Sequence, residues 1–134
     1  MDVHAGRPMA TVADIRHSPV MTIRDADTLW DAWQLMFVSG LRHLAVVDAG
    51  GGSIGIVSDR AILTDLPLTE RHLAGRHVKD VMSSPGCVTD DTGAHEAASR
   101  MARHAVDALP IVTGSGRPIA LLTAADLIDW VGRD

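Results

Sequence analysis

Thr123 and Asp126 are the pair of residues in this sequence whose types and spacing fit a binding site. They follow an apolar run that reads as a strand, and Leu127, Ile128 and Trp130 continue at helical spacing, so a helix is expected to begin here. A Ser/Thr-x-x-Asp/Glu pattern is typical of a capping box, which stabilises a helix by about 1 kcal/mol. The same arrangement offers an anion the helix N-terminus, beside a carboxylate that can accept from a pair of hydroxyl groups. Both interpretations stay open at this point.

The other chemistry-bearing residues form no recognisable catalytic motif. Cys87 is the only cysteine and has no histidine at motif spacing, so a thiol nucleophile is not expected. The histidines are scattered, and none pairs with cysteine or a carboxylate at ligand spacing, so no metal site is expected. The glycines at 50–52 lack the Lys-Ser/Thr of a phosphate-binding loop and are typical of a hairpin turn. The sequence therefore does not predict an enzyme.

Charge and composition limit the classes of partner. The chain has 134 residues, 46% of them hydrophobic, which is enough for one domain or two very small intertwined ones. A net charge of −5 argues against a nucleic-acid or anionic-membrane partner, because both require a basic face. No apolar run approaches the length of a membrane span, and residues 1–10 lack the apolar segment of a signal peptide. With a single cysteine, a reducing and cytoplasmic location is expected.

The elements that must position Thr123 and Asp126 can be followed along the chain. Residues 1–9 are expected to be a loose N-terminal arm. Periodicity, caps and turn residues then predict a helical turn at 12–15, a strand at 20–23, a helix at 29–39, strands at 43–47 and 54–57, and a helix from Ser58 to about Leu66. Residues 67–77 show no clear period and are expected to be a linker.

The same order of elements then restarts, which makes the chain an internal repeat. Residues 78–85 repeat residues 12–19 at an offset of 66, and a one-residue deletion near Gly86 changes the offset to 65. The glycine-rich turn recurs at 113–116. The two repeats are expected at 10–66 and 78–131. Each is too small to bury both faces of its sheet, so the halves are expected to pack together about a pseudo-twofold axis.

The ordered set of motifs resembles a tandem pair of CBS (cystathionine-β-synthase) domains, also called a Bateman module. The resemblance covers about residues 10–131 and rests on twin Val-x-Asp-Ile/Val…Ser-Pro segments, on the strands Leu-Arg-His-Leu-Ala-Val-Val-Asp and Ala-Leu-Pro-Ile-Val-Thr, and on two strand-to-helix junctions. It implies an α/β (α+β) fold of two β-α-β-β-α repeats, packed sheet to sheet with helices outside. It also implies a regulatory module without catalytic activity that binds an adenosine-containing ligand (AMP, ADP, ATP or S-adenosylmethionine) between the repeats.

By the same resemblance, the second junction, Thr123 to Asp126, belongs to a complete ligand site. Asp126 is expected to accept from the ribose hydroxyls, Arg42 and His43 to contact phosphate, and Met21 and Leu44 to offer apolar surface to the purine. Two alternatives stay open, in which Arg42 and His43 are a solvated strand end and Met21 and Leu44 are core residues. Backbone groups at Met21 and Ala45 are expected to read the edge of the base. The predicted ligand-binding residues are Val20, Met21, Thr22, Arg42, His43, Leu44, Ala45, Thr123 and Asp126.

The first junction, Ser58 to Ala61, is expected to be degraded. Ala61 stands where the ribose carboxylate is expected, and Asp107 stands where Arg42 stands in the other site, so a carboxylate would repel phosphate there. Arg60 offers partial compensation. One competent site is predicted.

Trp30, Trp33 and Phe37 form one stripe on the helix at 29–39, whereas the matching helix of the second repeat presents small residues. The stripe is expected to contribute to the core and to a homodimer interface, with a base-stacking platform as the minor alternative. Two functions remain open: a stand-alone sensor that signals a bound nucleotide to an unidentified effector protein, and a structural dimerisation module with no ligand.

Overall fold

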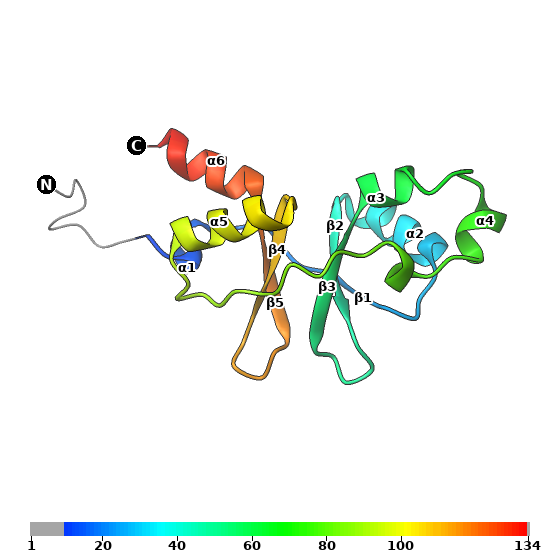
Figure 1. Cartoon of the computed structure of the whole chain (residues 1–134), viewed down its shortest axis with the longest axis horizontal. Helices are drawn as coiled ribbons and strands as arrows, with labels where there is room; N and C mark the ends of the chain where they lie inside the picture. Colours follow the sequence, from blue (N-terminus) through cyan, green and yellow to red (C-terminus); the bar gives the residue numbers. More distant parts are fainter. Residues whose placement is uncertain (1–9, 134) are drawn as a thin grey trace, which may run out of the picture.

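Two β-hairpins lie side by side at the centre of the molecule, and helices lie on their outer sides (Figure 1). The structure, a computed structural model, describes residues 10–133. β2 (His43–Val47) and β3 (Ser53–Ser58) form one antiparallel hairpin, and β4 (Ala108–Val112) and β5 (Pro118–Thr123) form the other. β1 (Thr22–Arg24) pairs in parallel with β2. In the second repeat a single parallel bridge between Val88 and Ile111 replaces that strand.

Seven helical segments surround the hairpins within the described residues. They are α1 (Val12–Ile15), α2 (Leu29–Ser39), α3 (Asp59–Leu63), α4 (Glu70–Ala74), the 3-10 helix η1 (Val78–Asp80), α5 (Ala94–His104) and α6 (Ala124–Gly132). The predicted helix at 29–39 is confirmed. Thr28 caps its N-terminus by accepting from Asp31 N–H at 3.1 Å, and Gly40 ends it in the left-handed conformation at φ 75°.

The internal repeat is visible in the hydrogen bonds that shape the two halves. Gly51 N–H donates to Asp48 C=O, and Gly116 N–H donates to Thr113 C=O 65 residues later. Both glycines have positive φ, 86° and 84°, which a side chain would disfavour in these turns. The two hairpins also share a register shift at equivalent places, Val46/Val47 and Ile111/Val112. The two halves therefore repeat one another in backbone detail.

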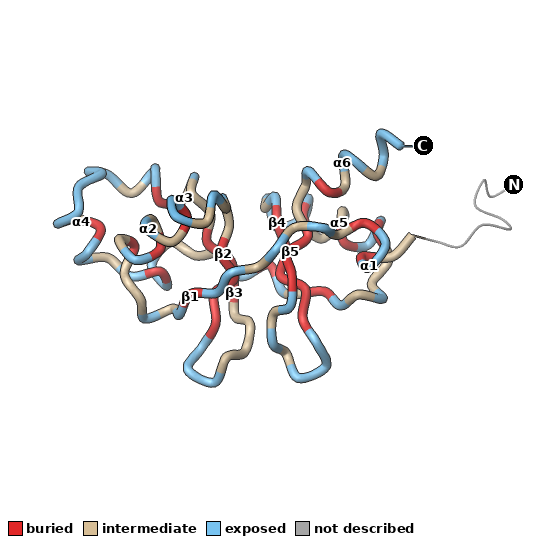
Figure 2. The backbone as a smooth tube through the Cα atoms, turned by 180° about the vertical axis from the view of Figure 1, so that it is seen from behind, coloured by how far each residue is buried: buried red, intermediate tan, exposed pale blue. Residues whose placement is uncertain are grey.

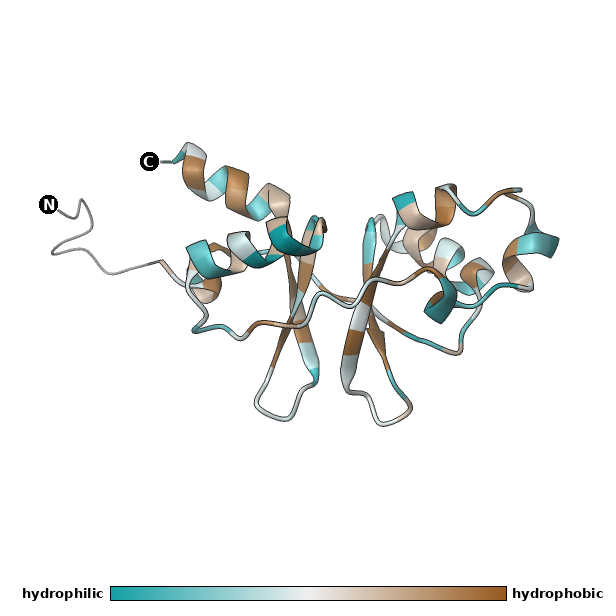
Figure 3. Cartoon of the chain, viewed as in Figure 1, coloured by the Kyte–Doolittle hydropathy of each residue, from teal (hydrophilic) through white to brown (hydrophobic). Residues whose placement is uncertain are grey.

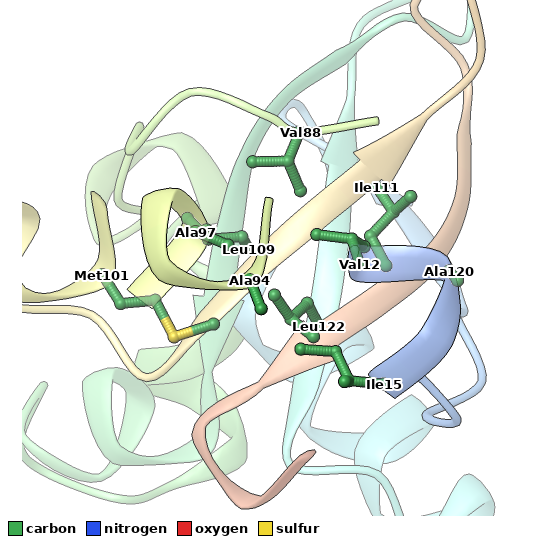
Figure 4. Packing of buried hydrophobic residues seen from close by; sticks show 10 residues of the cluster. All are labelled: Val12, Ile15, Val88, Ala94, Ala97, Met101, Leu109, Ile111, Ala120 and Leu122. Atoms are coloured by element: carbon green, nitrogen blue, oxygen red, sulfur yellow. The ribbon is translucent and has the colours of Figure 1, made fainter. Parts of the chain in front are cut away.

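The two repeats exchange their leading segments. Val12 and Ile15 of α1 are buried in the core of the second repeat, where Val12 lies beside Ile111 and Ile15 beside Leu122 (Figure 4). Val78 of η1 is correspondingly buried in the core of the first repeat. An ion pair from Arg16 to Asp90, with Nε to Oδ1 at 2.6 Å, fastens α1 to its partner repeat. Neither core is complete without residues from the other half.

The change of offset lies earlier than the sequence predicted. Leu121 N–H donates to Ser18 C=O, and the equivalent Ile56 N–H donates to Ser83 C=O, so Ser18 and Ser83 correspond at an offset of 65. The prediction of a deletion near Gly86 is therefore wrong. The extra residue of the first repeat is His17, which follows the helical turn of α1. The two Ser-Pro pairs misled the alignment because the second repeat contains two adjacent serines, Ser83 and Ser84.

The two sheets meet through a small apolar interface. Ala45 of β2, Ile56 of β3, Ala108 of β4 and Leu121 of β5 form a buried cluster there, with Val20 packed against it. Figure 2 shows the middle of each hairpin buried and the turns exposed. The alanines allow the strands to approach closely. The predicted α+β fold of two repeats, packed sheet to sheet with helices outside, is confirmed.

The segment expected to be a linker, 67–77, contains the helix α4. Leu73 of α4 is buried in the core of the first repeat. Arg76 forms an ion pair with Asp65, with Nε to Oδ2 at 2.9 Å. A five-residue helix is too short to give a period, so its single buried residue left no pattern. The strand expected at 20–23 is shifted to 22–24, and α3 ends at Leu63 rather than near Leu66. The predicted loose arm at 1–9 lies outside the described residues.

Acid is expected to destabilise the fold below about pH 4. The hydrogen bond from Arg76 lowers the pKa of Asp65, and the hydrogen bond from Thr89 lowers the pKa of Asp91. Because these folded-state pKa values lie below the unfolded ones, the native state binds fewer protons, and its stability falls as the pH drops through the folded pKa values. Urea unfolding from pH 7 to pH 3 measures this, and Asp65→Asn should give a shallower dependence. Equal dependences for both proteins would contradict the assignment.

Candidate functional site

A cavity of about 370 Å³ lies between the two repeats, beside the start of α6. We call it the second-junction cavity. Arg42 and His43 at the start of β2 line it from the first repeat, and Thr123 at the end of β5 lines it from the second. Ser18 and Asp107 also contribute to its wall. The structure thus brings three of the nine predicted ligand-binding residues together around one cavity.

Thr123 and Asp126 form the capping box that the sequence predicted as one of its two interpretations. Asp126 N–H donates to Thr123 Oγ1 at 3.2 Å, and Thr123 N–H donates to Asp126 Oδ2 at 2.9 Å. The strand β5 runs directly into α6, so Thr123 keeps extended dihedrals of φ −111° and ψ 160° while its side chain caps the helix. This pair therefore has a structural role whether or not a ligand binds.

The Asp126 carboxylate is enclosed by the leading segment of the chain. Only 2% of the residue is exposed, and it does not line the second-junction cavity. Ser18 Oγ donates toward both carboxylate oxygens, at 3.2 and 3.1 Å. His17 Nε2 lies 3.3 Å from Oδ1, while His17 Nδ1 lies 3.0 Å from Ile15 C=O. In this arrangement Asp126 does not face the cavity as the sequence predicted.

Arg42 and His43 reach the cavity because the left-handed Gly40 turns the chain from α2 into β2. Arg42 is exposed, and within residues 10–133 its guanidinium makes no hydrogen bond or ion pair. His43 instead bonds across the two repeats, with Nε2 at 2.8 Å from Asp107 Oδ1. Arg42 is therefore free to meet an anion, whereas His43 already has a carboxylate partner.

Asp107 is held in its ionised form. Burial raises its pKa, but the hydrogen bond and positive charge of His43, with smaller contributions from a backbone hydrogen bond and from Arg60, bring the pKa below its usual value. Half of its side chain remains exposed to the cavity, at 52%. The cavity therefore carries a fixed negative charge close to its free arginine.

The remaining predicted wall residues point elsewhere. Leu44 is fully buried in the core of the first repeat and Ala45 in the interface between the sheets, because neighbouring side chains of β2 face opposite sides of the sheet. Met21 C=O accepts from Ala45 N–H at 3.0 Å, so these groups bond each other. Leu44 and Ala45 therefore do not line the cavity with their side chains, and the purine wall and edge contacts stay predictions. Val20 packs on the sheet interface, and exposed Met21 and Thr22 do not line the cavity.

A second cavity of about 260 Å³ lies at the first junction. Ser58 caps α3 by accepting from Ala61 N–H at 3.1 Å, and Ala61 occupies the place that Asp126 has in the other repeat. Arg60 and Ser83 also line this cavity. His43 and Asp107 line both cavities, so their ion pair stands where the two meet.

Sequence reasoning missed Ser18 and His17 as partners of Asp126, and Asp107 as part of the second-junction wall. The contact of Ser18 with β5 is a tertiary bridge with no local signal. Asp107 was predictable in principle. It corresponds to Arg42 in the repeat, and equivalent residues close to a pseudo-twofold axis lie close to each other.

The aromatic stripe of α2 is divided between core and surface. Trp30 and Trp33 are half-buried against the first core, whereas Phe37 and Val38 are each 83% exposed. Exposed apolar residues also occur on α6, at Ile128 and Val131, and Figure 3 shows apolar bands along that helix. Between residues 10 and 133, none of the helices combines the length and apolar character needed to cross a lipid bilayer.

Relatives of known name match this chain over most of its length. Homoserine O-acetyltransferase from Methanococcoides burtonii is 31% identical over 130 residues, which cover 97% of this chain and 26% of that enzyme. The chain thus spans about a quarter of the length of the acetyltransferases it matches.

Solved structures match the whole arrangement. The CBS-pair protein CBSX2 from Arabidopsis thaliana has a TM-score of 0.74 and 25% identity, over 95% of this chain and 99% of that one. CBSX2 has also been solved in complex with AMP, with a TM-score of 0.71. The CBS domain pair of protein MJ0100, in complex with 5'-methylthioadenosine and S-adenosyl-L-methionine, has a TM-score of 0.79 at 20% identity, over 94% and 98% of the two chains.

The family model for the CBS domain matches residues 12–67 and again residues 78–133. These two matches correspond to the two halves that share turns, register shifts and a junction between their last strand and last helix. The chain therefore belongs to the CBS domain family, as a pair of CBS domains that exchange their leading segments.

Proposed function

We propose that this chain is a regulatory module that binds an adenosine-containing ligand (AMP, ADP, ATP or S-adenosylmethionine) in the second-junction cavity. The observation that carries the proposal is the unpaired guanidinium of Arg42, which lines an inter-repeat cavity at the start of α6. A free guanidinium can bond a phosphate or carboxylate through two parallel N–H groups. The N-terminal end of the nine-residue α6 adds a partial positive charge on the opposite side.

The surroundings of Asp126 support a role in binding hydroxyl groups. Its carboxylate already accepts from the hydroxyl of Ser18 through both oxygens. A ribose hydroxyl is the same kind of donor, so it can replace Ser18 without leaving the buried carboxylate unsatisfied. Ligand binding would then move Ser18 and His17 away from Asp126. That displacement couples the site to α1, and through α1 to the core of the second repeat.

We also propose that the bound state is passed to a partner protein through a homodimer. A ligand that joins Thr123 and Asp126 to Arg42 favours one relative position of the two repeats. The exposed Phe37 and Val38, beside Trp30 and Trp33 on α2, supply the apolar surface for a second copy.

A structural dimerisation module without a ligand is the second candidate. The enclosed carboxylate of Asp126 favours it, because the polar groups of the junction satisfy one another in this arrangement. The two functions differ in one measurable property, the affinity for adenosine ligands.

Arg42→Ala is expected to weaken AMP binding by about 10- to 100-fold, because a hydrogen-bonded charge pair contributes about 1.5–3 kcal/mol. Isothermal titration calorimetry with AMP and S-adenosylmethionine, on the wild type and the variant, measures this. Arg103→Ala removes the same charge from an exposed position on α5, outside the cavity, and should change the affinity less than about twofold.

Each contrary outcome has a distinct meaning. If the wild type gives no heat with any adenosine ligand, the structural module is supported and ligand binding is rejected. If AMP binds but Arg42→Ala leaves its affinity unchanged, the ligand occupies a different site, and the first-junction cavity becomes the candidate.

A further inference from the structure

In the part of the chain that the structure describes, one unpaired cation and one exposed carboxylate line the second-junction cavity. Arg42 is the cation there without a partner among the described residues, since His43 is already bonded to Asp107 at 2.8 Å. Asp107 faces the cavity with about half of its side chain exposed. A ligand that brings one phosphate can therefore meet Arg42, but every further phosphate adds negative charge to a cavity that a carboxylate also lines.

Asp107 also stands at one boundary of the second-junction cavity. Arg42 and Asp107 occupy equivalent positions in the two repeats, and their backbones make the same contact. Arg42 C=O accepts from Asp59 N–H at 2.9 Å, and Asp107 C=O accepts from Ala124 N–H at 2.8 Å. Because Asp107 lines both cavities, it marks the boundary between them. A chain of phosphates that begins at Arg42 and extends from the second-junction cavity toward the first-junction cavity meets the Asp107 carboxylate.

We propose that Asp107 sets the number of phosphates that the site accepts, so that a nucleoside monophosphate binds and a triphosphate is disfavoured. This inference rests on the proposed function of the same cavity. A phosphate monoester carries about two negative charges at neutral pH, and each further phosphate increases that charge. At physiological salt, charges within about 8 Å of each other are only partly screened, so repulsion by Asp107 grows with phosphate number.

The carboxylate cannot avoid this repulsion by taking up a proton near neutral pH. The bond from His43 and the neighbouring Arg60 hold its pKa below the usual value, although burial acts in the opposite direction. Arg60 lines the first-junction cavity, on the other side of the boundary. It therefore stabilises the charge on Asp107, but it does not itself line the second-junction cavity.

The test compares AMP, ADP and ATP by calorimetry, without magnesium and at fixed ionic strength, on the wild type and Asp107→Asn. The wild type is expected to bind AMP at least about tenfold more tightly than ATP. Asparagine keeps the size of the side chain and an oxygen for His43, but it removes the charge. The variant should bind ATP about tenfold more tightly than the wild type does, and AMP only about two- to threefold more tightly. Glu96→Gln, which removes one charge from an exposed site on α5, should preserve the wild-type ratio.

The outcomes separate this inference from the function on which it rests. Equal affinities of the wild type for AMP and ATP, or an unchanged ratio in Asp107→Asn, would overturn the role of Asp107 while ligand binding stands. An absence of heat with all three nucleotides and with S-adenosylmethionine would overturn the proposed function, and this inference with it. A thermal melt of each variant confirms that the comparison is made between folded proteins.

Discussion

Residues 1–77 and residues 78–134, prepared as separate chains, are expected to remain unfolded as monomers and to fold when they are mixed. The reason is the exchange of leading segments. The core of the second repeat lacks Val12 and Ile15 when the first half is absent, and the core of the first repeat lacks Val78 when the second half is absent. Each half also loses the sheet interface formed by Ala45, Ile56, Ala108 and Leu121.

The free energies involved are large enough that each separate half should be unfolded and not merely less stable. Burial of one large aliphatic side chain contributes about 1.5–3 kcal/mol, and a natural domain is stable by only about 5–15 kcal/mol in total. Loss of two such side chains together with the sheet interface removes more stabilising free energy than the net stability of a fragment of half this size. Circular dichroism and urea unfolding, with the molar mass measured in solution, check the result. A cooperative unfolding transition in either fragment as a monomer would contradict the exchange.

Asp126→Ala is expected to destabilise the protein by about 3 kcal/mol, which corresponds to a fall of about 10 °C in melting temperature. The substitution removes half of the capping box, a loss of about 1 kcal/mol. It also leaves two half-buried donors, the Ser18 hydroxyl and the Thr123 N–H, without their acceptor. A buried donor that loses its partner costs about 1–3 kcal/mol.

Asp129→Ala provides the matched control for that experiment. Asp129 lies on the same helix, one residue after Ile128, and forms an exposed ion pair with Arg133, four residues away. Exposed pairs of this kind contribute less than about 0.5 kcal/mol, so the control should melt close to the wild type. Similar melting temperatures for Asp126→Ala and Asp129→Ala would show that the enclosed carboxylate contributes little to the fold.

The sequence was sufficient for elements with strong local signals. The helix at 29–39 has a cap at Thr28 and a terminating Gly40, and β2 lies where its apolar run predicted, at 43–47. Prediction from the sequence failed where the structure depends on residues that are distant in the chain. Nothing local to residues 12–15 tells which half they pack against, so the exchange of segments was not predicted. The short helix α4 was missed because one buried leucine gives no period.

The candidate site was predicted only in part, because some of its contacts depend on residues that are distant in the chain. Arg42, His43 and Thr123 lie around one cavity because two equivalent repeats placed about an axis bring the ends of their strands together. Leu44 lies in the core and Ala45 lies between the sheets, and the sequence left this open because the alternation of β2 does not reveal which side faces the core and which faces the other sheet. Asp126 was found by its spacing, but its enclosure by Ser18 required the fold.

The ion pair between His43 and Asp107 forms part of the wall of both cavities, so the two compartments are not thermodynamically independent. A molecule that draws His43 toward one compartment removes the hydrogen bond that Asp107 receives from it. If a ligand in one compartment changes the affinity of the other, linkage requires the reverse effect to have the same factor. If each compartment holds a ligand, the shared bond of 2.8 Å is the contact through which the two binding events are coupled.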